Sequence, residues 1–415
     1  MRVTESRGIF RAPFPIFAAI IGAAICLGEK NEKPVKASGD SAVAVAQSTV
    51  SAPLSVANAP IAIQLDEANK KTPKYERYEK VITEKMLRDD LTFLADDKHE
   101  GRVAGGKHLE NEVTQYIERI FRECGLKGLG DVTGNYKQEF IIDWKTTAEK
   151  IEGNPDGEFE IKKKYVLIPI SNIPKVLSYE AIRTHNLVAL LEGSDEKLKD
   201  EYIVLCAHMD HLGINKLAKP GEDFIFNGAD DNASGVSVIL SVIRAFAQAK
   251  KEGNGPKRSL IILFPSAEEM GALGSKYFVE NPPIPLGKQR AAINLDMVGR
   301  RDPSNCISVI DTNKDGKPNF FHDLHDALLC DTGIEHVNHD IESLRRRSDQ
   351  ARFEDKDILF LYIGEGPGPN NQLNEDYHKV TDEALKINFL QLRQVAIFSF
   401  RNVWKALNKE NLFQD

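Results

Sequence analysis

Cysteine is scarce in this sequence. Five cysteines occur among 415 residues, and their spacing fits no metal knuckle and no disulfide-rich framework. An excess of basic charge is also absent: the formal net charge is −8 and no basic stripe stands out, which argues against a nucleic-acid partner. No internal repeat is present. Hydrophobic residues make up 41% of the chain, so most of it can bury a core, in one large domain or two or three small ones.

Long hydrophobic runs are absent except for one near the N-terminus. Residues 12–28 (APFPIFAAIIGAAICLG) carry no charge and follow a start with three arginines. The run is short beside the roughly 20 apolar residues of a spanning helix. This pattern is typical of a signal peptide, with an N-terminal anchor as the alternative, and predicts an exported protein that is periplasmic, secreted or anchored facing outward. Residues 29–72 show no hydrophobic period and predict a disordered linker.

Residues 73–410 alternate helix-like and strand-like segments and are predicted to form one catalytic domain. Short, nearly continuous apolar runs are typical of strands buried on both faces. Their alternation with amphipathic segments favours an α/β sheet flanked by helices on both faces. Residues 144–185 are predicted to be an irregular excursion. The expected strands are 202–207, 259–264, 291–295, 307–310 and 358–363, and the expected helices are 82–93, 111–124, 233–250, 274–280, 319–330 and 383–406.

Metal-binding residue types collect at the ends of the predicted strands. His208 follows the first of the buried strands, Glu269 follows the second, and Asp296 follows the third. Asp231 lies in the stretch NGADDNASG, just before a long helix, and His378 lies in a polar segment before the last helix. In open α/β sheets, ligands bind outside the carboxyl ends of the strands. We therefore expect these five side chains to meet in one site.

Two imidazoles and three carboxylates are a donor set that zinc accepts. Five ligands exceed what one tetrahedral zinc takes, and they suit two metals roughly 3.5–4 Å apart with one bridging carboxylate. Because neighbouring side chains at a strand end point apart, Glu268 would face the reacting water and act as general base. Asp210 is placed to accept the second ring N–H of His208. His211 is expected to line the cleft outside the ligand set.

Five segments in this order resemble the di-zinc aminopeptidase family, which includes bacterial leucyl aminopeptidases, aminopeptidase Y and glutamate carboxypeptidase. They are HMDH (208–211), GADDNASG (228–235), SAEEMGALGS (266–275), INLDMVG (293–299) and YHKVTD (377–382). The resemblance implies a mixed, mostly parallel central sheet and two Zn²⁺ ions. One difference is the sequence Ser-Asp-Gln at 348–350, where relatives often carry Ser-Asp-His.

The resemblance also implies roles, position by position. His208 and Asp296 would hold one zinc, Glu269 and His378 the other, and Asp231 would bridge them. Glu268 would be the catalytic acid and base, Asp210 the carboxylate behind His208, and Tyr377 a stabiliser of the developing oxyanion. The family further implies a cis peptide bond after Asp231.

These observations predict an exported di-zinc exopeptidase acting on peptides, in the first place an aminopeptidase. Alternatives are a carboxypeptidase or dipeptidase that uses an arginine from Arg345–Arg347 to meet a substrate carboxylate, or a catalytically silent binding protein. The segment DTNKDG (311–316) resembles half of a calcium loop, but its twelfth position is His322, so a plain turn is the alternative. Oligomeric state is left open, and membrane attachment is expected only through the N-terminus.

Overall fold

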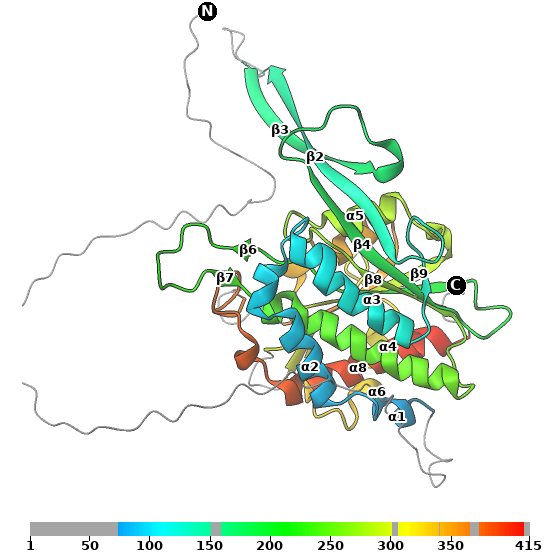
Figure 1. The fold of residues 1–415 in the computed structure, drawn as a ribbon. Helices are drawn as coiled ribbons and strands as arrows, with labels where there is room; N and C mark the ends of the chain where they lie inside the picture. The colour runs from blue at the N-terminus through cyan, green and yellow to red at the C-terminus, as the bar shows by residue number, and fades with distance from the viewer. Residues whose placement is uncertain (1–73, 151–158, 301–305, 340, 366–372, 411–415) are drawn as a thin grey trace, which may run out of the picture. The chain divides into compact units, whose positions relative to one another are not determined.

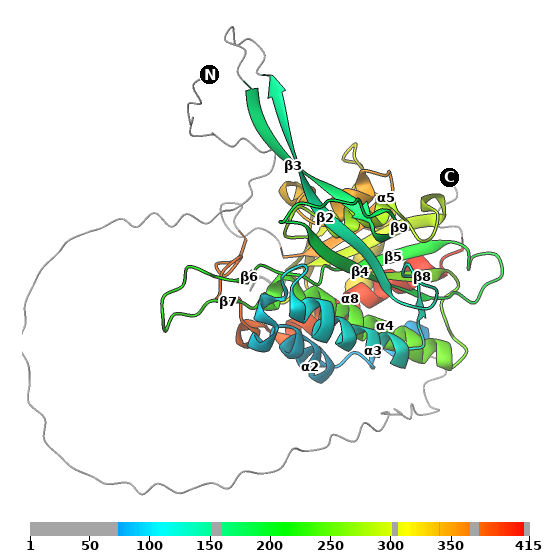
Figure 2. The same ribbon diagram turned by 45° about the horizontal axis from the view of Figure 1, so that its top comes forward.

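The computed structural model describes residues 74–150, 159–300, 306–339, 341–365 and 373–410 (Figures 1 and 2). The predicted signal peptide or anchor and the predicted linker lie outside these residues. From residue 72 onward the chain forms one compact unit. Among the described residues, no helix combines the length and apolarity that a membrane crossing requires.

A ten-stranded mixed sheet forms the centre of the described chain, with the order β11-β10-β12-β9-β5-β8-β4-β2-β3 and β1 beside β4. Its central strands β12, β9, β5 and β8 run parallel to one another, and β4 and β2 continue it in antiparallel register. The predicted fold class is therefore confirmed. The strands are β1 (Lys127–Gly128), β2 (Lys137–Lys150), β3 (Phe159–Pro169), β4 (Ile182–Leu191), β5 (Tyr202–Cys206), β8 (Ser259–Phe264), β9 (Gln289–Asp296), β10 (Cys306–Ile310), β11 (His336–Asn338) and β12 (Leu359–Gly364).

Helices cover both faces of this sheet, because alternate strand residues point to opposite sides. Ile203 and Leu205 of β5 face a core with α4 and α8, whereas Val204 and Cys206 face a second core with α5 and α7. The helices are α1 (Lys74–Glu79), α2 (Glu84–Leu94), α3 (Thr114–Glu123), α4 (Gly235–Lys251), α5 (Leu273–Glu280), α6 (His325–Leu329), α7 (Gln350–Glu354) and α8 (Phe389–Asn408). A small separate ribbon pairs β6 (Gly213–Ile214) with β7 (Ile225–Phe226).

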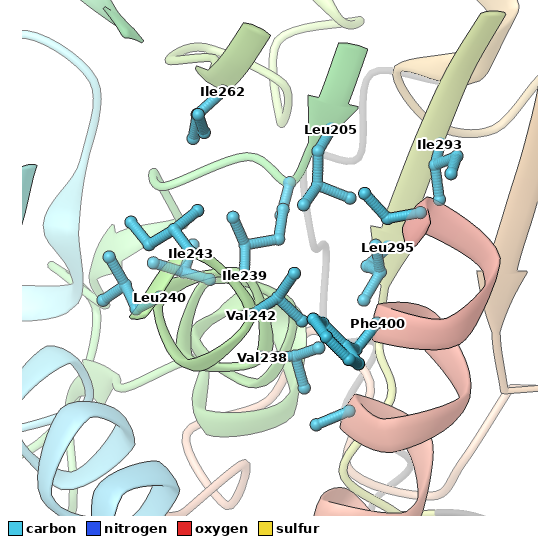
Figure 3. Packing of buried hydrophobic residues seen from close by; sticks show 14 of the residues in the cluster. Leu205, Val238, Ile239, Leu240, Val242, Ile243, Ile262, Ile293, Leu295 and Phe400 are labelled. Carbon is cyan, nitrogen blue, oxygen red and sulfur yellow. The ribbon is translucent and has the colours of Figure 1, made fainter. Parts of the chain in front are cut away.

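The helix α4 is buried along most of its length, which fixes the loop that precedes it. Figure 3 shows Val238, Ile239 and Val242 of this helix packed among strand residues such as Leu205 and beside Phe400 of α8. All of these side chains are fully buried. Burying each such side chain contributes about 1.5–3 kcal/mol to the stability of the fold. This packing fixes the position of the start of α4.

The prediction that residues 144–185 are irregular is wrong for most of that segment. The strands β2 and β3 form a long antiparallel hairpin with register from Phe140↔Pro169 to Lys150↔Phe159, and β4 already begins at Ile182. Beyond Ile142, β2 pairs with β3 alone, and Figure 1 shows the hairpin extending away from the sheet. Near the sheet the hairpin has an apolar face, in which Phe140 and Ile142 are buried and Tyr165 and Leu167 pack against the same cluster.

Two predicted helices are shorter than the pattern suggested. The segment 319–330 contains a 3₁₀ turn and the short helix α6. At its start, the side chain of Asn319 donates to the carbonyl of Phe360 and accepts from the backbone N–H of Phe321. The last helix begins at Phe389 rather than near residue 383. Asn388 precedes it in an extended conformation and caps it by accepting from the backbone N–H of Gln391.

Candidate metal centre

The predicted ligands come together at the carboxyl edge of the parallel strands. His208 follows β5, Glu269 follows β8, Asp296 ends β9, and Asp231 lies in the turn before α4. His378 reaches the same place from the segment before α8. The atom His208 Nε2 lies 3.3 Å from Asp231 Oδ1 and 3.4 Å from Asp296 Oδ1. The atom His378 Nε2 lies 3.3 Å from Asp231 Oδ2 and 3.1 Å from Glu269 Oε2.

These distances divide the donors into two groups that share Asp231. Its Oδ1 faces His208 and its Oδ2 faces His378, and the side chain is only 5% exposed. With zinc–ligand bonds near 2.0–2.2 Å, donor atoms of one tetrahedral site lie about 3.3–3.6 Å apart. The spacing within both groups is close to that value. The donor set therefore fits two zinc ions with Asp231 between them.

His211 differs from the predicted ligands in its geometry. Its Nδ1 lies 2.6 Å from Glu269 Oε1 and 3.9 Å from Asp231 Oδ2. A separation of 2.6 Å is a hydrogen bond and is too short for two donors on one zinc. His211 therefore orients Glu269 from behind, and the sequence pattern did not indicate this role.

The backbone around Asp231 is held by residues from distant parts of the chain. The carboxylate of Asp382 accepts hydrogen bonds from the N–H groups of Asp230 and Asp231, each at 3.0 Å. The side chain of Asn232 donates to Leu295 O and accepts from Gly235 N, which ties the start of α4 to the end of β9. The Asp231–Asn232 peptide bond is cis, as the family resemblance implied.

Two glycines in this turn permit close backbone approaches. Gly228 has a φ of +57°, and a Cβ built there would lie 2.2 Å from the Asp231 carbonyl oxygen. A Cβ at Gly235 would lie 2.4 Å from Asn232 Oδ1 and 2.7 Å from Leu295 O. Both positions exclude any side chain, which explains the glycines on either side of the aspartate pair.

Arg102 is a buried residue that sequence reasoning missed. Its guanidinium donates to the carbonyls of Leu94 (2.8 Å), Met209 (3.2 Å), Asn227 (2.5 Å) and Gly228 (2.9 Å). Burial lowers its pKa to about 10, while nearby carboxylates such as Asp382 oppose the shift. Its charge thus lies close to the carboxylates of the site, and its hydrogen bonds join the loops that carry His208 and Asp231. No local pattern marks a lone arginine for this role.

Asp210 does not take its expected position against His208. The distance from His208 Nδ1 to Asp210 Oδ1 is 3.8 Å, whereas the Asp210 carbonyl oxygen lies at 3.2 Å and is the closer acceptor. The Asp210 carboxylate instead accepts from the backbone N–H of Glu268 at 3.1 Å. Backbone carbonyls also orient metal-binding histidines. Asp210 therefore links the two strand ends, and burial raises the pKa of its carboxyl to about 7.

The buried charges perturb each other strongly. Burial lowers the pKa of His208, but the Asp296 charge and the Asp231 contact outweigh it and hold that pKa well above its usual value. Burial raises the pKa of Asp231, and the hydrogen bonds from His208 and His378 outweigh that effect, so its pKa lies well below the usual range. Burial raises the pKa of Glu268 well above its usual range. The site thus gathers buried carboxyl groups whose charged forms a bound cation would stabilise.

Asp349 is a further carboxylate that the sequence did not assign to the site. It is fully buried, and burial raises its pKa to about 6 while the His208 charge opposes the shift. The neighbours Ser348 and Gln350 accept hydrogen bonds from the side chain of Asn294 in β9. The signal was the segment Ser-Asp-Gln, which the resemblance marked only as a difference.

A cavity opens beside this centre. Among its lining residues are Asp231, Glu268, Asp296, Tyr377 and His378, so the predicted general base shares the cavity with three predicted ligands. Tyr377 also stacks on the ring of His378, with centroids 3.8 Å apart. Glu365 and Arg347 complete the charged lining.

The chain is similar to known peptidases. A sequence profile of Peptidase family M28 matches residues 186–400, just over half of the chain. A vacuolar membrane protease of Lodderomyces elongisporus is 30% identical over 210 residues, covering 51% of this chain and 17% of that protein. A probable glutamate carboxypeptidase of Arabidopsis thaliana is 31% identical over 115 residues, covering 28% of this chain and 14% of that protein. The chain thus spans well under a quarter of the length of these two curated relatives.

Among solved structures, an aminopeptidase from an Aneurinibacillus species has the same fold. It is 16% identical, with a TM-score of 0.56, and the match covers 82% of this chain and 98% of that chain.

Proposed function

Because this chain belongs to Peptidase family M28, we propose that it is a zinc metallopeptidase, and more narrowly an exported di-zinc aminopeptidase that releases N-terminal residues from peptides. The observation that carries the proposal is the position of Asp231. Each oxygen of its carboxylate faces a different histidine, at 3.3 Å in both cases. Each histidine also contacts a carboxylate of its own, Asp296 or Glu269.

In this proposal the chain holds one zinc with His208 and Asp296, holds the other with Glu269 and His378, and shares Asp231 between them. When bound, the zinc ions would polarise the scissile carbonyl and lower the pKa of a water molecule. Every other contribution comes from side chains of the protein itself.

Glu268 would accept a proton from the attacking water and return it to the departing nitrogen. It lines the same cavity as the ligands, and its burial favours the protonated form that the second half of this cycle needs. Tyr377 lines the cavity on the side of His378, where its hydroxyl would donate to the developing oxyanion.

The charge of the cavity supports an amino-terminal substrate. Besides the proposed ligands Asp231, Asp296 and His378, the lining carries the carboxyl groups of Glu268 and Glu365 against the single arginine Arg347. An ammonium group can donate to these two carboxyl groups, whereas a substrate carboxylate finds only Arg347 as a charged partner outside the proposed ligands. This favours removal of residues from a free N-terminus.

Arg347 supports a second candidate, the carboxypeptidase or dipeptidase. Arg345 and Arg346 pair with carboxylates such as Glu354. Arg347 instead donates to the hydroxyl of Tyr377 at 3.3 Å, and no ion pair is seen for it among the described residues. Its guanidinium is therefore available for the carboxylate of a blocked acidic dipeptide.

A substrate panel separates the two candidates. The purified chain is assayed on aminoacyl p-nitroanilides and on N-blocked acidic dipeptides, with and without a zinc chelator. Cleavage of the first set, lost with chelator, supports the aminopeptidase. Turnover of only the blocked set, lost in Arg347→Ala, would replace it with the carboxypeptidase. Absence of turnover on both sets in zinc-loaded protein would favour a silent binding protein.

A further inference from the structure

A second cluster of histidine and carboxylate lies away from the catalytic cavity, around Asp311. The carboxylate is 1% exposed, and three imidazoles approach it through the same ring atom, Nδ1. His322 and His325 lie 2.9 Å and 3.2 Å from Asp311 Oδ2, and His339 lies 3.1 Å from Asp311 Oδ1. None of these residues lines the catalytic cavity.

Sheet topology brings two of these residues together. The strands β10 and β11 are parallel neighbours, with Ser308 opposite Asn338. Asp311 comes just after the first strand and His339 just after the second. Since parallel strands end at the same edge of a sheet, their following residues meet there.

The turn after β10 returns His322 to the same point. Backbone hydrogen bonds close the turn from Asn313 N to Lys317 O, and Asn319 N donates to Asp311 O at 2.8 Å. Asp315 faces away, because its carboxylate pairs with Lys317 in solvent. The segment 311–316 is therefore a closed turn in which Asp315, the second acidic residue of the calcium-like motif, points away from Asp311. The twelfth position, His322, does reach Asp311.

His325 supplies an independent observation. It is 2% exposed, and neither of its ring nitrogens meets the geometry of a hydrogen bond, although Nδ1 lies 3.2 Å from Asp311 Oδ2. Leaving a buried imidazole without a hydrogen bond is unfavourable. In contrast, donor atoms of Asp311, His322 and His339 all lie within 4.8 Å of one another, so one ion can reach all three.

We propose that Asp311, His322 and His339 bind a further zinc ion, separate from the catalytic centre, while the buried His325 lies beside the Asp311 carboxylate. Imidazole and carboxylate nitrogen and oxygen donors are the set that zinc accepts, and three protein ligands leave one coordination position for water. The side chains of His322 and His339 are each 37% exposed, which gives the ion a path from solvent. The bound ion ties the ends of β10 and β11 to the turn before α6.

The test is zinc stoichiometry in the full chain. Protein stripped of metal is reloaded with zinc, desalted and analysed by mass spectrometry of the metal. His322→Ala/His339→Ala is expected to hold one zinc per chain fewer than the unaltered protein. Because the result is a difference between two proteins, it holds whether the catalytic centre takes one zinc or two. It is also independent of any peptidase activity.

A matched control is Asp315→Ala, on the same turn and also exposed, which is expected to keep the full zinc count. Zinc should raise the melting temperature of the stripped control by a few degrees more than that of the double variant, since ligand binding to the folded state alone stabilises it. If the double variant does not fold, His322→Gln alone replaces it. The dissociation constant of the zinc ion at this second site is then expected to rise at least tenfold. Equal zinc counts and equal affinities in variant and control overturn the proposal and leave a hydrogen-bonded cluster.

Discussion

Two clusters of histidine and carboxylate lie at strand ends of one sheet, and they differ in charge balance. At the catalytic centre, Asp231, Glu269 and Asp296 face two histidines, with further buried carboxylates close by. At the other cluster, Asp311 alone faces three histidines. The first cluster has a buried excess of carboxyl groups, whose charged forms a bound cation would stabilise. The second can satisfy its single carboxylate with imidazole N–H groups. We therefore infer that metal is essential to the first and stabilising to the second.

Metal removal should give the largest effect and sharpen this comparison. Stripping zinc from the full chain is expected to abolish turnover, because the acidic centre then has no cations. Removing only the second site by His322→Ala/His339→Ala should leave turnover near that of the unaltered protein. Peptidase assays on both preparations check this. Full activity after complete stripping, verified by metal analysis, contradicts the proposed mechanism.

Glu268→Gln should cause the next largest loss. The amide has the shape of the carboxyl but cannot carry the proton, so turnover is expected to fall by about 10²–10⁴-fold with zinc content unchanged. Steady-state kinetics with metal analysis measures both quantities. The exposed Glu375→Gln on the neighbouring segment is the control and should behave as the unaltered protein. Equal kinetics for the two variants would refute the role of Glu268 as general base.

The adjacent pair Asp230 and Asp231 repeats the comparison at closer range. Asp231 faces two histidines, whereas Asp230 accepts from Gly299 N at 2.7 Å and from Asn374 Nδ2 at 3.0 Å. Burial raises the pKa of Asp230 well above its usual range, and neighbouring Glu365 adds to the shift. Asp231→Asn should lose zinc. Its activity should fall by more than the roughly 10–100-fold that is typical when a residue outside the ligand set of a metal site is changed.

Asp230→Asn should keep the zinc count and most of the activity, because the amide resembles the protonated carboxyl that it replaces. Metal analysis of both variants is the measurement. Zinc loss from Asp230→Asn together with retention in Asp231→Asn would reverse the assignment of the pair.

The smallest expected effect concerns pH. Burial raises the pKa of Glu365 to about 7 from an ordinary 4.5. A carboxyl with a raised folded pKa stabilises the fold below its unfolded pKa, and that stability is lost as pH rises through the folded value. In metal-free protein, this group should therefore remove on the order of 2–3 kcal/mol between pH 4.5 and 7.

Glu365→Gln should flatten that decline, and denaturant unfolding of the stripped protein at pH 5 and pH 8 measures it. An unchanged difference between the two pH values would mean that Glu365 ionises normally in the folded chain.

Much of the architecture was predictable because the buried strands have continuous apolar runs. The predicted strand 259–264 matches β8 residue for residue, and the strand ends led directly to His208, Glu269 and Asp296. The hairpin β2–β3 escaped prediction because the many lysines and the prolines of residues 144–185 favour an irregular interpretation. β4 was missed because its start fell within the segment that was expected to be irregular.

The sequence by itself determined which residue types stand at which strand ends. Each buried strand is a local hydrophobic run, and the residues that end it follow directly in the sequence. Only the tertiary structure decided which of those groups come into contact. Asp382 holds the backbone of Asp231 from 151 residues away. Arg102 joins two loops from behind, His211 orients Glu269, and Asp210 turns to Glu268 rather than to His208. These contacts depend on long-range packing between elements, and no periodicity in the sequence encodes them.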